Sequence, residues 1–238
     1  MWRMTYSILT NMGLMLKLDE KMHRMVDQPD KYSEKDKYEY VRYIVELMQK
    51  SGHIKTTCFG TENLPAEGGY ILYPNHQGKY DAYGIVSAHE KPLSLVMDRQ
   101  MSYFAFVNEI VDMVDGKRMD LHDARNGLMV MKQVAQEVSQ GRRYIIFPEG
   151  TYDNKKPHSL LDFKPGCFKA AMKVGAPIVP VALVDSHKPY NSWQITPVKT
   201  QVHFLKPLYA QDYKNLNTHQ VAELVKNRIR EKLDQLGK

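Results

Sequence analysis

Two residues with the chemistry of a proton-transfer pair, His76 and Asp81, lie five positions apart in the stretch "NHQGKYD". Imidazole has an unperturbed pKa of about 6.5, so it can take up a proton near neutral pH. A carboxylate that binds the other ring nitrogen fixes the tautomer and stabilises the imidazolium. The pair can therefore act as a general base, provided that the two side chains meet.

The spacing of this pair predicts the local structure that would bring the side chains together. Five positions along an α-helix leave two side chains about 140° apart, and an odd separation on a strand points them to opposite faces. The chain must therefore turn between them, and Gly78 permits such a turn. We expect a strand that delivers His76, a turn, and a helix that begins near Asp81.

A second polar cluster, "FPEGTYD" at residues 147–153, also follows a strand-like run. The carboxyl ends of parallel strands share one edge of a sheet, and ligands bind at that edge. We therefore expect Glu149 and Gly150 to lie in the same site as His76 and Asp81.

The chain from residue 54 onward alternates between short apolar strands and amphipathic helices. This alternation predicts an α/β fold with a mixed, largely parallel sheet flanked by helices. The helix expected over 122–139 has Leu128 on its apolar stripe, and the last helix has Thr218 as its cap. Further helices are expected near 80–88, 166–174 and 218–236, and strands at 54–60, 69–74, 93–97, 109–114, 142–148, 176–184 and 200–205.

Residues 1–52 are expected to form a helical hairpin ahead of an α/β domain that spans residues 53–238. Ser33 and Gly52 predict the ends of the second helix, with the turn at residues 28–30. The uncharged stretch 4–16 is shorter than the ~20 residues that cross a bilayer. Three interpretations of it stay open: a helix that packs on the core, one that lies on the membrane surface, and a true span despite its short length.

Composition limits the partners of the chain. Its 238 residues carry a net charge of +6 with a pI of about 9.1, which favours anionic partners such as phosphate-bearing substrates or an acidic membrane surface. There is no P-loop, GxGxxG or GxSxG motif and no recognisable nucleic-acid module, so no nucleic-acid partner is expected. Cys58 and Cys167 lie far apart without a Cys/His cluster, which predicts free thiols and no metal site. We expect no secretory signal and a cytoplasmic location.

Four stretches, in order, resemble the motifs of the glycerophospholipid acyltransferase family, which includes the 1-acylglycerol-3-phosphate O-acyltransferases. They are "NHQGKYD", "VDGKRMD" at 114–120, "FPEGT", and "APIVPVAL" at 176–183. The first resembles the family's His-x4-Asp motif, the third is matched residue for residue, and the likeness runs from about residue 55 to about residue 208. The resemblance implies an enzyme of phospholipid biosynthesis that moves an acyl group from a thioester to a lysophosphatidic acid-type acceptor. The donor would be coenzyme A or acyl carrier protein, and no cofactor is implied.

The resemblance also implies roles for individual residues. His76 would be the general base that deprotonates the acceptor hydroxyl, and Asp81 would orient it. The enzyme would work on lipids while bound peripherally to the inner face of the membrane. The acceptor would be held by Arg118, Glu149, Gly150, Thr151 and Lys164.

Two departures from the family pattern bear on the acceptor. Tyr152 stands where the family commonly has an arginine, and Asp98 stands where a lysine is expected. Lys155, Lys156 and Lys164 could supply positive charge instead. Two alternatives therefore stay open: an acyltransferase for a different lysophospholipid or a glycolipid, and a non-catalytic relative that binds membrane lipid.

Overall fold

A seven-stranded sheet forms the centre of the computed structural model, which describes residues 12–104, 106–191 and 196–238. Every neighbouring pair of strands is parallel except β6 and β7, so the predicted mixed, largely parallel sheet is confirmed. In spatial order the strands are β1 (Ile54–Phe59), β7 (Val198–Phe204), β6 (Ile178–Val184), β2 (Ile71–Pro74), β5 (Tyr144–Ile145), β3 (Ser94–Asp98) and β4 (Lys117–Met119).

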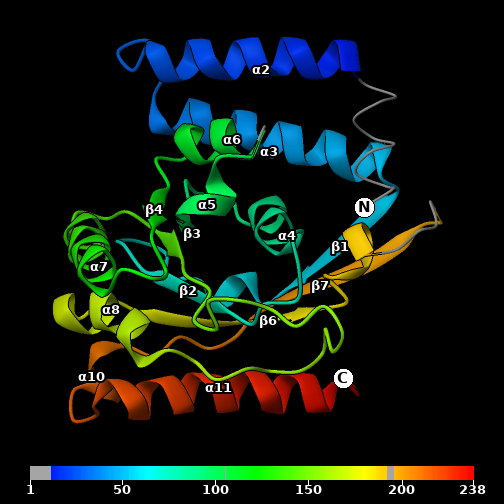
Figure 1. The fold of residues 1–238 in the computed structure, drawn as a ribbon. Helices are drawn as coiled ribbons and strands as arrows, with labels where there is room; N and C mark the ends of the chain where they lie inside the picture. The colour runs from blue at the N-terminus through cyan, green and yellow to red at the C-terminus, as the bar shows by residue number, and fades with distance from the viewer. Residues whose placement is uncertain (1–11, 105, 192–195) are drawn as a thin grey trace.

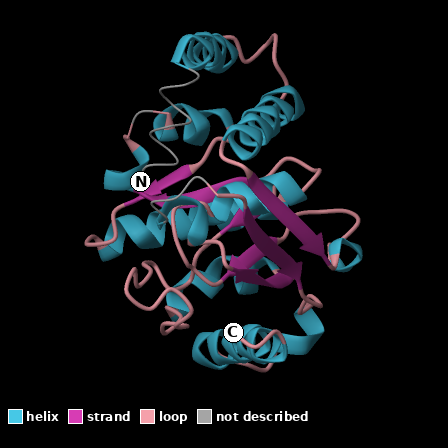
Figure 2. Cartoon of the chain, turned by 90° about the vertical axis from the view of Figure 1, so that its right-hand side faces the viewer, coloured by secondary structure: helices cyan, strands magenta, loops and turns pink. Residues whose placement is uncertain are grey.

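Helices enclose the sheet on both faces, and each face has its own apolar core (Figures 1 and 2). One face carries α3 (Glu34–Ser51), α4 (Asp81–Ala88) and α6 (Val107–Met113), with α2 (Met12–Asp27) packed outside them. The other carries α7 (Ala124–Ser139), α8 (Lys169–Val174) and α11 (Thr218–Gln235). The connections include α5 (Arg99–Ser102), α9 (Lys188–Asn191), α10 (Ala210–Tyr213) and the 3-10 turns η1 (Thr61–Asn63) and η2 (Pro165–Phe168).

Helices α2 and α3 form the predicted N-terminal hairpin. Ser33 caps α3 as predicted, because its Oγ accepts the N–H of Asp36 at 3.2 Å while Asp36 accepts the N–H of Ser33 at 2.9 Å. Apolar residues of both helices, including Met22 and Val45, are fully buried in the core that also contains the sheet. The division of the chain at residue 52 therefore stays a prediction.

The N-terminal apolar stretch is described only in part. Residues 4–11 of the predicted stretch 4–16 lie outside the described residues. Among the helices that the structure does describe, none combines the length and the apolar character that crossing a bilayer requires. Both cysteines are free, as predicted.

One predicted strand is wrong. Residues 109–113 belong to helix α6 (Val107–Met113) and Val114 is its C-cap; Ile110, Val111 and Met113 are buried between the sheet and the N-terminal helices. A short apolar run has no period that separates a strand from a buried helix. After α6 the chain turns at Asp115, which has a φ of +50°, into the edge strand β4. The apolar pattern did not predict β4, because the strand is three residues long and two of them are basic.

Two details of the predicted helices also differ from the structure. Leu128 is 63% exposed, because only the later turns of α7, from Val130 onward, pack on the core. The cap of α11 is Asn217 rather than Thr218, since Asn217 and Gln220 accept each other's backbone N–H at 3.0 and 2.8 Å. These two hydrogen bonds satisfy two backbone N–H groups at the start of the helix that have no partner within it.

Candidate active site

His76 and Asp81 meet at the carboxyl end of β2. Strand β2 ends at Pro74, the chain turns, and Asp81 is the first residue of α4, as the spacing predicted. His76 Nδ1 lies 2.7 Å from Asp81 Oδ2. The Asp81 side chain is 1% exposed, whereas the His76 side chain is 19% exposed. The imidazole therefore faces the solvent edge while its carboxylate partner lies beneath it.

The hydrogen bond between the pair determines the imidazole tautomer. A carboxylate can only accept, so Nδ1 of His76 carries the proton and Nε2 keeps its lone pair. Among the described residues, none is hydrogen-bonded to Nε2. This nitrogen is therefore the atom that can take a proton from an incoming hydroxyl.

Gly78 allows the turn for a reason that the sequence did not reveal. Its φ is not in the left-handed region. A β-carbon at this position would instead lie 3.3 Å from the Cα of His187, which is closer than ordinary packing. The turn that joins His76 to Asp81 thus lies directly against the chain that follows β6.

The Asp81 carboxylate is held by further donors. Its Oδ2 also accepts the backbone N–H groups of Gln77 and Gly78, at 2.6 and 3.0 Å. Its Oδ1 accepts the hydroxyl of Ser186 at 2.6 Å, and the N–H of Ser186 donates to Gln77 Oε1 at 2.9 Å. Ser186 is 3% exposed. With four donors, the carboxylate is fixed in position beneath the imidazole.

Sequence reasoning missed Ser186. It lies 105 positions from Asp81, and a single serine after a strand carries no chemical signature. The strand order supplies the contact, because β6 is the neighbour of β2 and the two strands are parallel. Both carboxyl ends therefore reach the same edge of the sheet.

Two aromatic rings of the "FPEGTYD" segment enclose the imidazole. Phe147 stacks on His76 with ring centroids 4.3 Å apart, and Tyr152 meets it edge-on at 4.6 Å. Burial raises the pKa of the Tyr152 hydroxyl, and the charge of Asp81 adds to this effect. The residue in the place of the family's arginine therefore packs on the candidate base.

Glu149 lies beside His76, as predicted, but it contacts the backbone. Its Oε1 accepts the N–H of His76 at 2.7 Å, and its Oε2 accepts the N–H of Leu161 at 2.8 Å. Glu149 is 3% exposed. Burial raises the pKa of its carboxyl, and the two backbone N–H groups oppose that rise in part.

Gly150 and Lys164 adjoin each other next to Glu149. Gly150 has a φ of +70°, and a β-carbon there would lie 2.6 Å from Lys164 Nζ. The backbone conformation therefore favours glycine, and a larger residue would also displace the flexible end of the Lys164 side chain. Lys164 and Thr151 are exposed, and the Lys164 N–H donates to the carbonyl of Pro148 at 2.8 Å. The structure thus brings all these predicted residues to one edge.

Arg118 is the predicted residue that the structure does not bring to His76. It lies on β4, three strands from β2, which at ~4.8 Å per strand is about 14 Å between backbones. Its Nη2 is 2.8 Å from Asp112 Oδ1 and 3.0 Å from Asn108 Oδ1. Its role in binding phosphate stays a prediction, because a carboxylate already pairs with the guanidinium.

The remaining polar residues singled out by the sequence have local partners. Asp98 caps α5 by accepting the N–H of Gln100 at 2.9 Å, which explains an acidic residue where the family has a lysine. Lys155 and Lys156 are exposed on the loop after Tyr152.

Among the described residues, one group has the arrangement of metal ligands. Asp19, His23 and Glu109 have ligand atoms within 4.8 Å of one another. They lie on α2 and α6 rather than beside His76. The predicted site itself therefore consists of acid–base and hydrogen-bonding groups.

Comparison with known proteins agrees with this fold and gives the family. The Acyltransferase family model matches residues 55–184, which is more than half of the chain. A 1-acyl-sn-glycerol-3-phosphate acyltransferase of Cocos nucifera is 25% identical over 172 residues, covering 71% of this chain and 54% of that protein. The enzyme of the same name from Escherichia coli K12 is 23% identical over 186 residues, covering 78% of this chain and 75% of that protein.

A solved structure has the same fold. The crystal structure of the 1-acyl-sn-glycerophosphate (LPA) acyltransferase PlsC from Thermotoga maritima matches with a TM-score of 0.72 at 18% identity. The match covers 97% of this chain and 98% of the PlsC chain. This chain spans about half of the length of the coconut relative.

The sheet, its edge and the His-x4-Asp pair define an α/β protein of the acyltransferase class. The chain belongs to the Acyltransferase family.

Proposed function

We propose that this protein transfers a fatty acyl group from a thioester to the free hydroxyl of a lysophosphatidic acid-type acceptor. The observation that carries the proposal is the 2.7 Å hydrogen bond between His76 Nδ1 and Asp81, within the segment that the family model matches. The relatives named above are 1-acyl-sn-glycerol-3-phosphate acyltransferases, which supports this class of acceptor.

The proposed reaction uses the acceptor itself as the nucleophile. A hydroxyl has a pKa far above 7, so His76 Nε2 removes its proton as the oxygen attacks the thioester carbonyl. The buried charge of Asp81 stabilises the imidazolium that forms. The tetrahedral intermediate then loses the thiolate, which takes the proton back from His76. The products are a new ester and a free thiol.

In this proposal the acceptor lies beside Gly150, Thr151 and Lys164. The left-handed glycine lets a ligand approach the backbone closely, and the exposed ammonium of Lys164 can pair with a phosphate. Arg118 takes part only if phosphate replaces Asp112 on its guanidinium. Coenzyme A and acyl carrier protein are both kept as sources of the thioester.

A comparison of two histidine variants tests the proposal. Transfer of a labelled acyl chain from acyl-CoA to lysophosphatidic acid is measured for wild type, His76→Ala and His219→Ala. Loss of a general base typically slows a reaction about 10²–10⁴-fold, so His76→Ala is expected to show that loss. His219 is exposed on α11, and its variant is expected to match wild type. Equal rates for wild type and His76→Ala would remove His76 as the base.

A second candidate function is acylation of a different lysophospholipid or glycolipid. It is favoured by Tyr152, which packs on His76 where the family commonly has an arginine. Mass spectrometry of the products formed from a mixed pool of lysolipids separates the two candidates. Preferential conversion of lysophosphatidic acid would eliminate the second.

A further inference from the structure

The two oxygens of the Glu149 carboxylate are both occupied by backbone amides. One binds the N–H of His76 at 2.7 Å and the other binds the N–H of Leu161 at 2.8 Å. The residue is 3% exposed, so little of the carboxylate can be reached by a ligand. A contact between Glu149 and the acceptor would have to displace one of these hydrogen bonds.

The two amides belong to segments that are far apart in the sequence. His76 follows β2, whereas Leu161 lies near the end of the irregular segment 150–164 that crosses the site. Glu149 thus joins the backbone of the candidate base to this segment. The same segment carries Tyr152, whose ring meets the imidazole at 4.6 Å.

The charge on Glu149 is balanced by hydrogen bonds rather than by an ion pair. Within the described residues, no lysine, arginine or histidine nitrogen forms a salt bridge with its carboxylate. Two backbone N–H groups are the donors that a buried carboxylate needs in order to stay ionised. Glutamine cannot replace this arrangement, because its amide offers one acceptor oxygen and turns N–H donors toward the second backbone N–H.

We propose that Glu149 is a positioning residue, which holds the backbone of His76 against segment 150–164 and does not bind the acceptor. This inference rests on the proposed function and deepens it, since it assigns the family's acidic third-motif residue to the base rather than to the lipid. The acceptor is then contacted by the neighbours of Glu149, namely Gly150, Thr151 and Lys164.

The two roles predict different kinetics. If Glu149 positions His76, Glu149→Gln lowers kcat, and a displacement of the base by about 1 Å costs about 10²-fold. The KM for the acceptor then stays within about twofold of wild type, because no contact with the acceptor is lost. If Glu149 binds the acceptor, the same variant raises the KM for the acceptor instead.

The test combines steady-state kinetics with hydrogen exchange. Wild type, Glu149→Gln, Glu149→Asp and the control Asp162→Asn are assayed with lysophosphatidic acid at varied concentration and saturating acyl-CoA. Asp162 is an exposed carboxylate of the same segment, bonded to Lys226 at 2.5 Å, and its variant is expected to stay within about twofold of wild type. Amide exchange at His76 and Leu161 is measured in the same samples. At least one of these two amides is expected to exchange about tenfold or more faster in Glu149→Gln than in wild type, because glutamine keeps one acceptor oxygen for two N–H groups.

The outcomes are distinct. A raised acceptor KM with unchanged kcat, or unchanged exchange at both amides, would overturn the inference. If Glu149→Gln does not fold, the kcat and acceptor KM of Glu149→Asp replace those of Glu149→Gln. Slow exchange of the His76 and Leu161 amides in wild type then supports the inference, and unprotected amides overturn it. If wild type transfers no acyl group to any lysolipid, the proposed function fails, while the exchange data still decide whether Glu149 holds the two segments.

Discussion

At the scale of single residues, the site is organised around the position of one imidazole. His76 is bound at its ring by Asp81 and at its backbone by Glu149, at 2.7 Å in both cases. Phe147 stacks on its ring and Tyr152 meets the ring in an edge-on contact. These contacts leave one ring nitrogen free for chemistry, which is the preorganisation that a general base needs.

The first prediction concerns Ser186, which donates to the Asp81 carboxylate. We expect Ser186→Ala to lower kcat/KM about tenfold, since a hydrogen bond to a charged group contributes about 1.5 kcal/mol. Without this donor the Asp81 carboxylate keeps three of its four hydrogen bonds and is held less firmly beneath the imidazole. Ser159→Ala makes the same chemical change in the nearby loop, where the hydroxyl donates to the carbonyl of Lys156, and serves as the control. A kcat/KM equal to that of wild type would mean that Ser186 only fills space.

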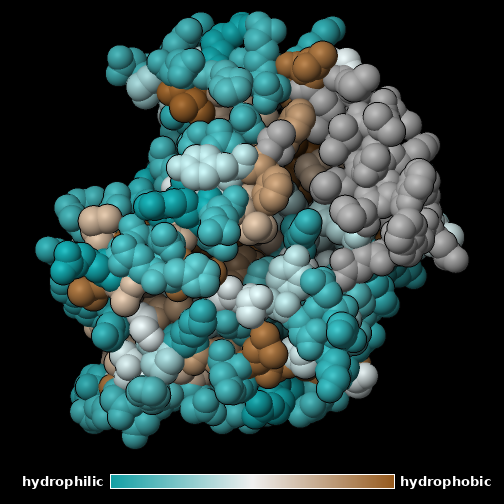
Figure 3. Space-filling view, viewed as in Figure 1, coloured by the Kyte–Doolittle hydropathy of each residue, from teal (hydrophilic) through white to brown (hydrophobic). Residues whose placement is uncertain are grey.

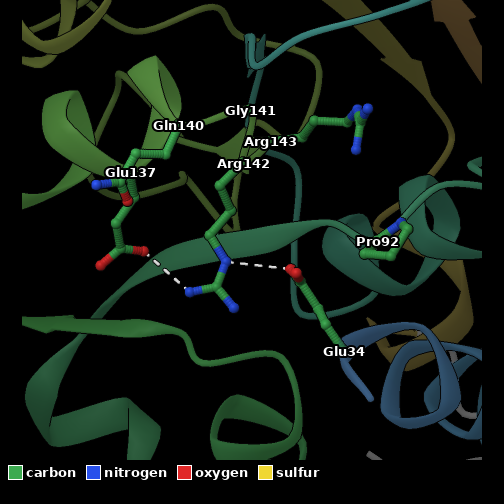
Figure 4. A pocket seen from close by; sticks show the side chains of 7 residues that line it. All are labelled: Glu34, Pro92, Glu137, Gln140, Gly141, Arg142 and Arg143. Carbon is green, nitrogen blue, oxygen red and sulfur yellow. Dashed lines mark hydrogen bonds and ion pairs between the residues drawn. The ribbon is translucent and has the colours of Figure 1, made fainter.

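At the scale of elements, ion pairs at the opposite edge of the sheet join the N-terminal hairpin to the α/β layers. Arg142 precedes β5 and pairs with Glu34 of α3 at 3.1 Å, with Asp115 before β4 at 2.5 Å, and with Glu137 of α7 at 3.0 Å. Figure 4 shows the guanidinium between Glu34 and Glu137 in a polar pocket. One side chain thus links four elements.

The second prediction concerns the stability that Arg142 contributes. Its side chain is 18% exposed, so Arg142→Ala leaves three carboxylates without their shared partner. We expect the free energy of unfolding to fall by about 2 kcal/mol, below the range for fully buried pairs because two of the carboxylates are about half exposed. Urea denaturation measures this change. Arg24→Ala, which breaks the exposed Arg24–Glu20 pair, should change stability by less than about 0.5 kcal/mol.

The third prediction is a pH dependence of stability at the end of α4. His89 is 1% exposed, its Nε2 lies 2.6 Å from the Tyr70 hydroxyl, and its Nδ1 lies 2.8 Å from the Lys91 carbonyl. Burial lowers the pKa of His89 to about 4, below its ordinary value of 6.5. As the pH falls, His89 is protonated in the unfolded chain before it is protonated in the folded protein. Stability therefore falls as the pH drops below about 6.5.

The size of this effect can be isolated with a variant. Between pH 7 and pH 5 the lowered pKa accounts for a loss of about 2 kcal/mol in the free energy of unfolding. His89→Gln removes the titrating group. The free energy of unfolding of this variant should therefore fall between pH 7 and pH 5 by about 2 kcal/mol less than that of wild type. Equal slopes in wild type and variant, measured by urea denaturation, would contradict the lowered pKa.

At the scale of the whole molecule, the surface is hydrophilic over most of the face shown in Figure 3, including α2 and α11. These two helices lie on opposite sides of the sheet in Figure 1. The net charge of +6 favours anionic surfaces in general, but does not say which side meets a membrane. Lys17 and Lys21 are exposed on α2, next to the N-terminal apolar stretch.

The fourth prediction is that α2 faces the bilayer if the protein binds membranes, as the family resemblance implies. Each basic residue near an anionic surface contributes about 1 kcal/mol, so Lys17→Gln with Lys21→Gln should weaken co-sedimentation with phosphatidylserine vesicles about 30-fold. Lys214→Gln with Arg230→Gln removes the same charge from exposed positions at the opposite side, and should change binding little. Equal weakening by both pairs would mean that net charge, rather than α2, controls binding.

Much of this architecture can be read from the residues in order. Alternating apolar periods predicted six of the seven strands and the longer helices around them except α6, because burial on one or two faces imposes those periods. The strand, turn and helix that join His76 to Asp81 were also predictable, since the contact lies within six consecutive residues. The motif resemblance supplied the class of chemistry, which the family match supports.

Other features depend on which strands are neighbours, and periodicity carries no information about strand order. Glu149 binds the His76 backbone across 73 positions, and Ser186 binds Asp81 across 105. Segment 109–114 became a helix because α2 and α3 offered it an apolar partner. Contacts of this range arise only when the sheet has assembled, so the partners of each site residue were decided by packing in three dimensions.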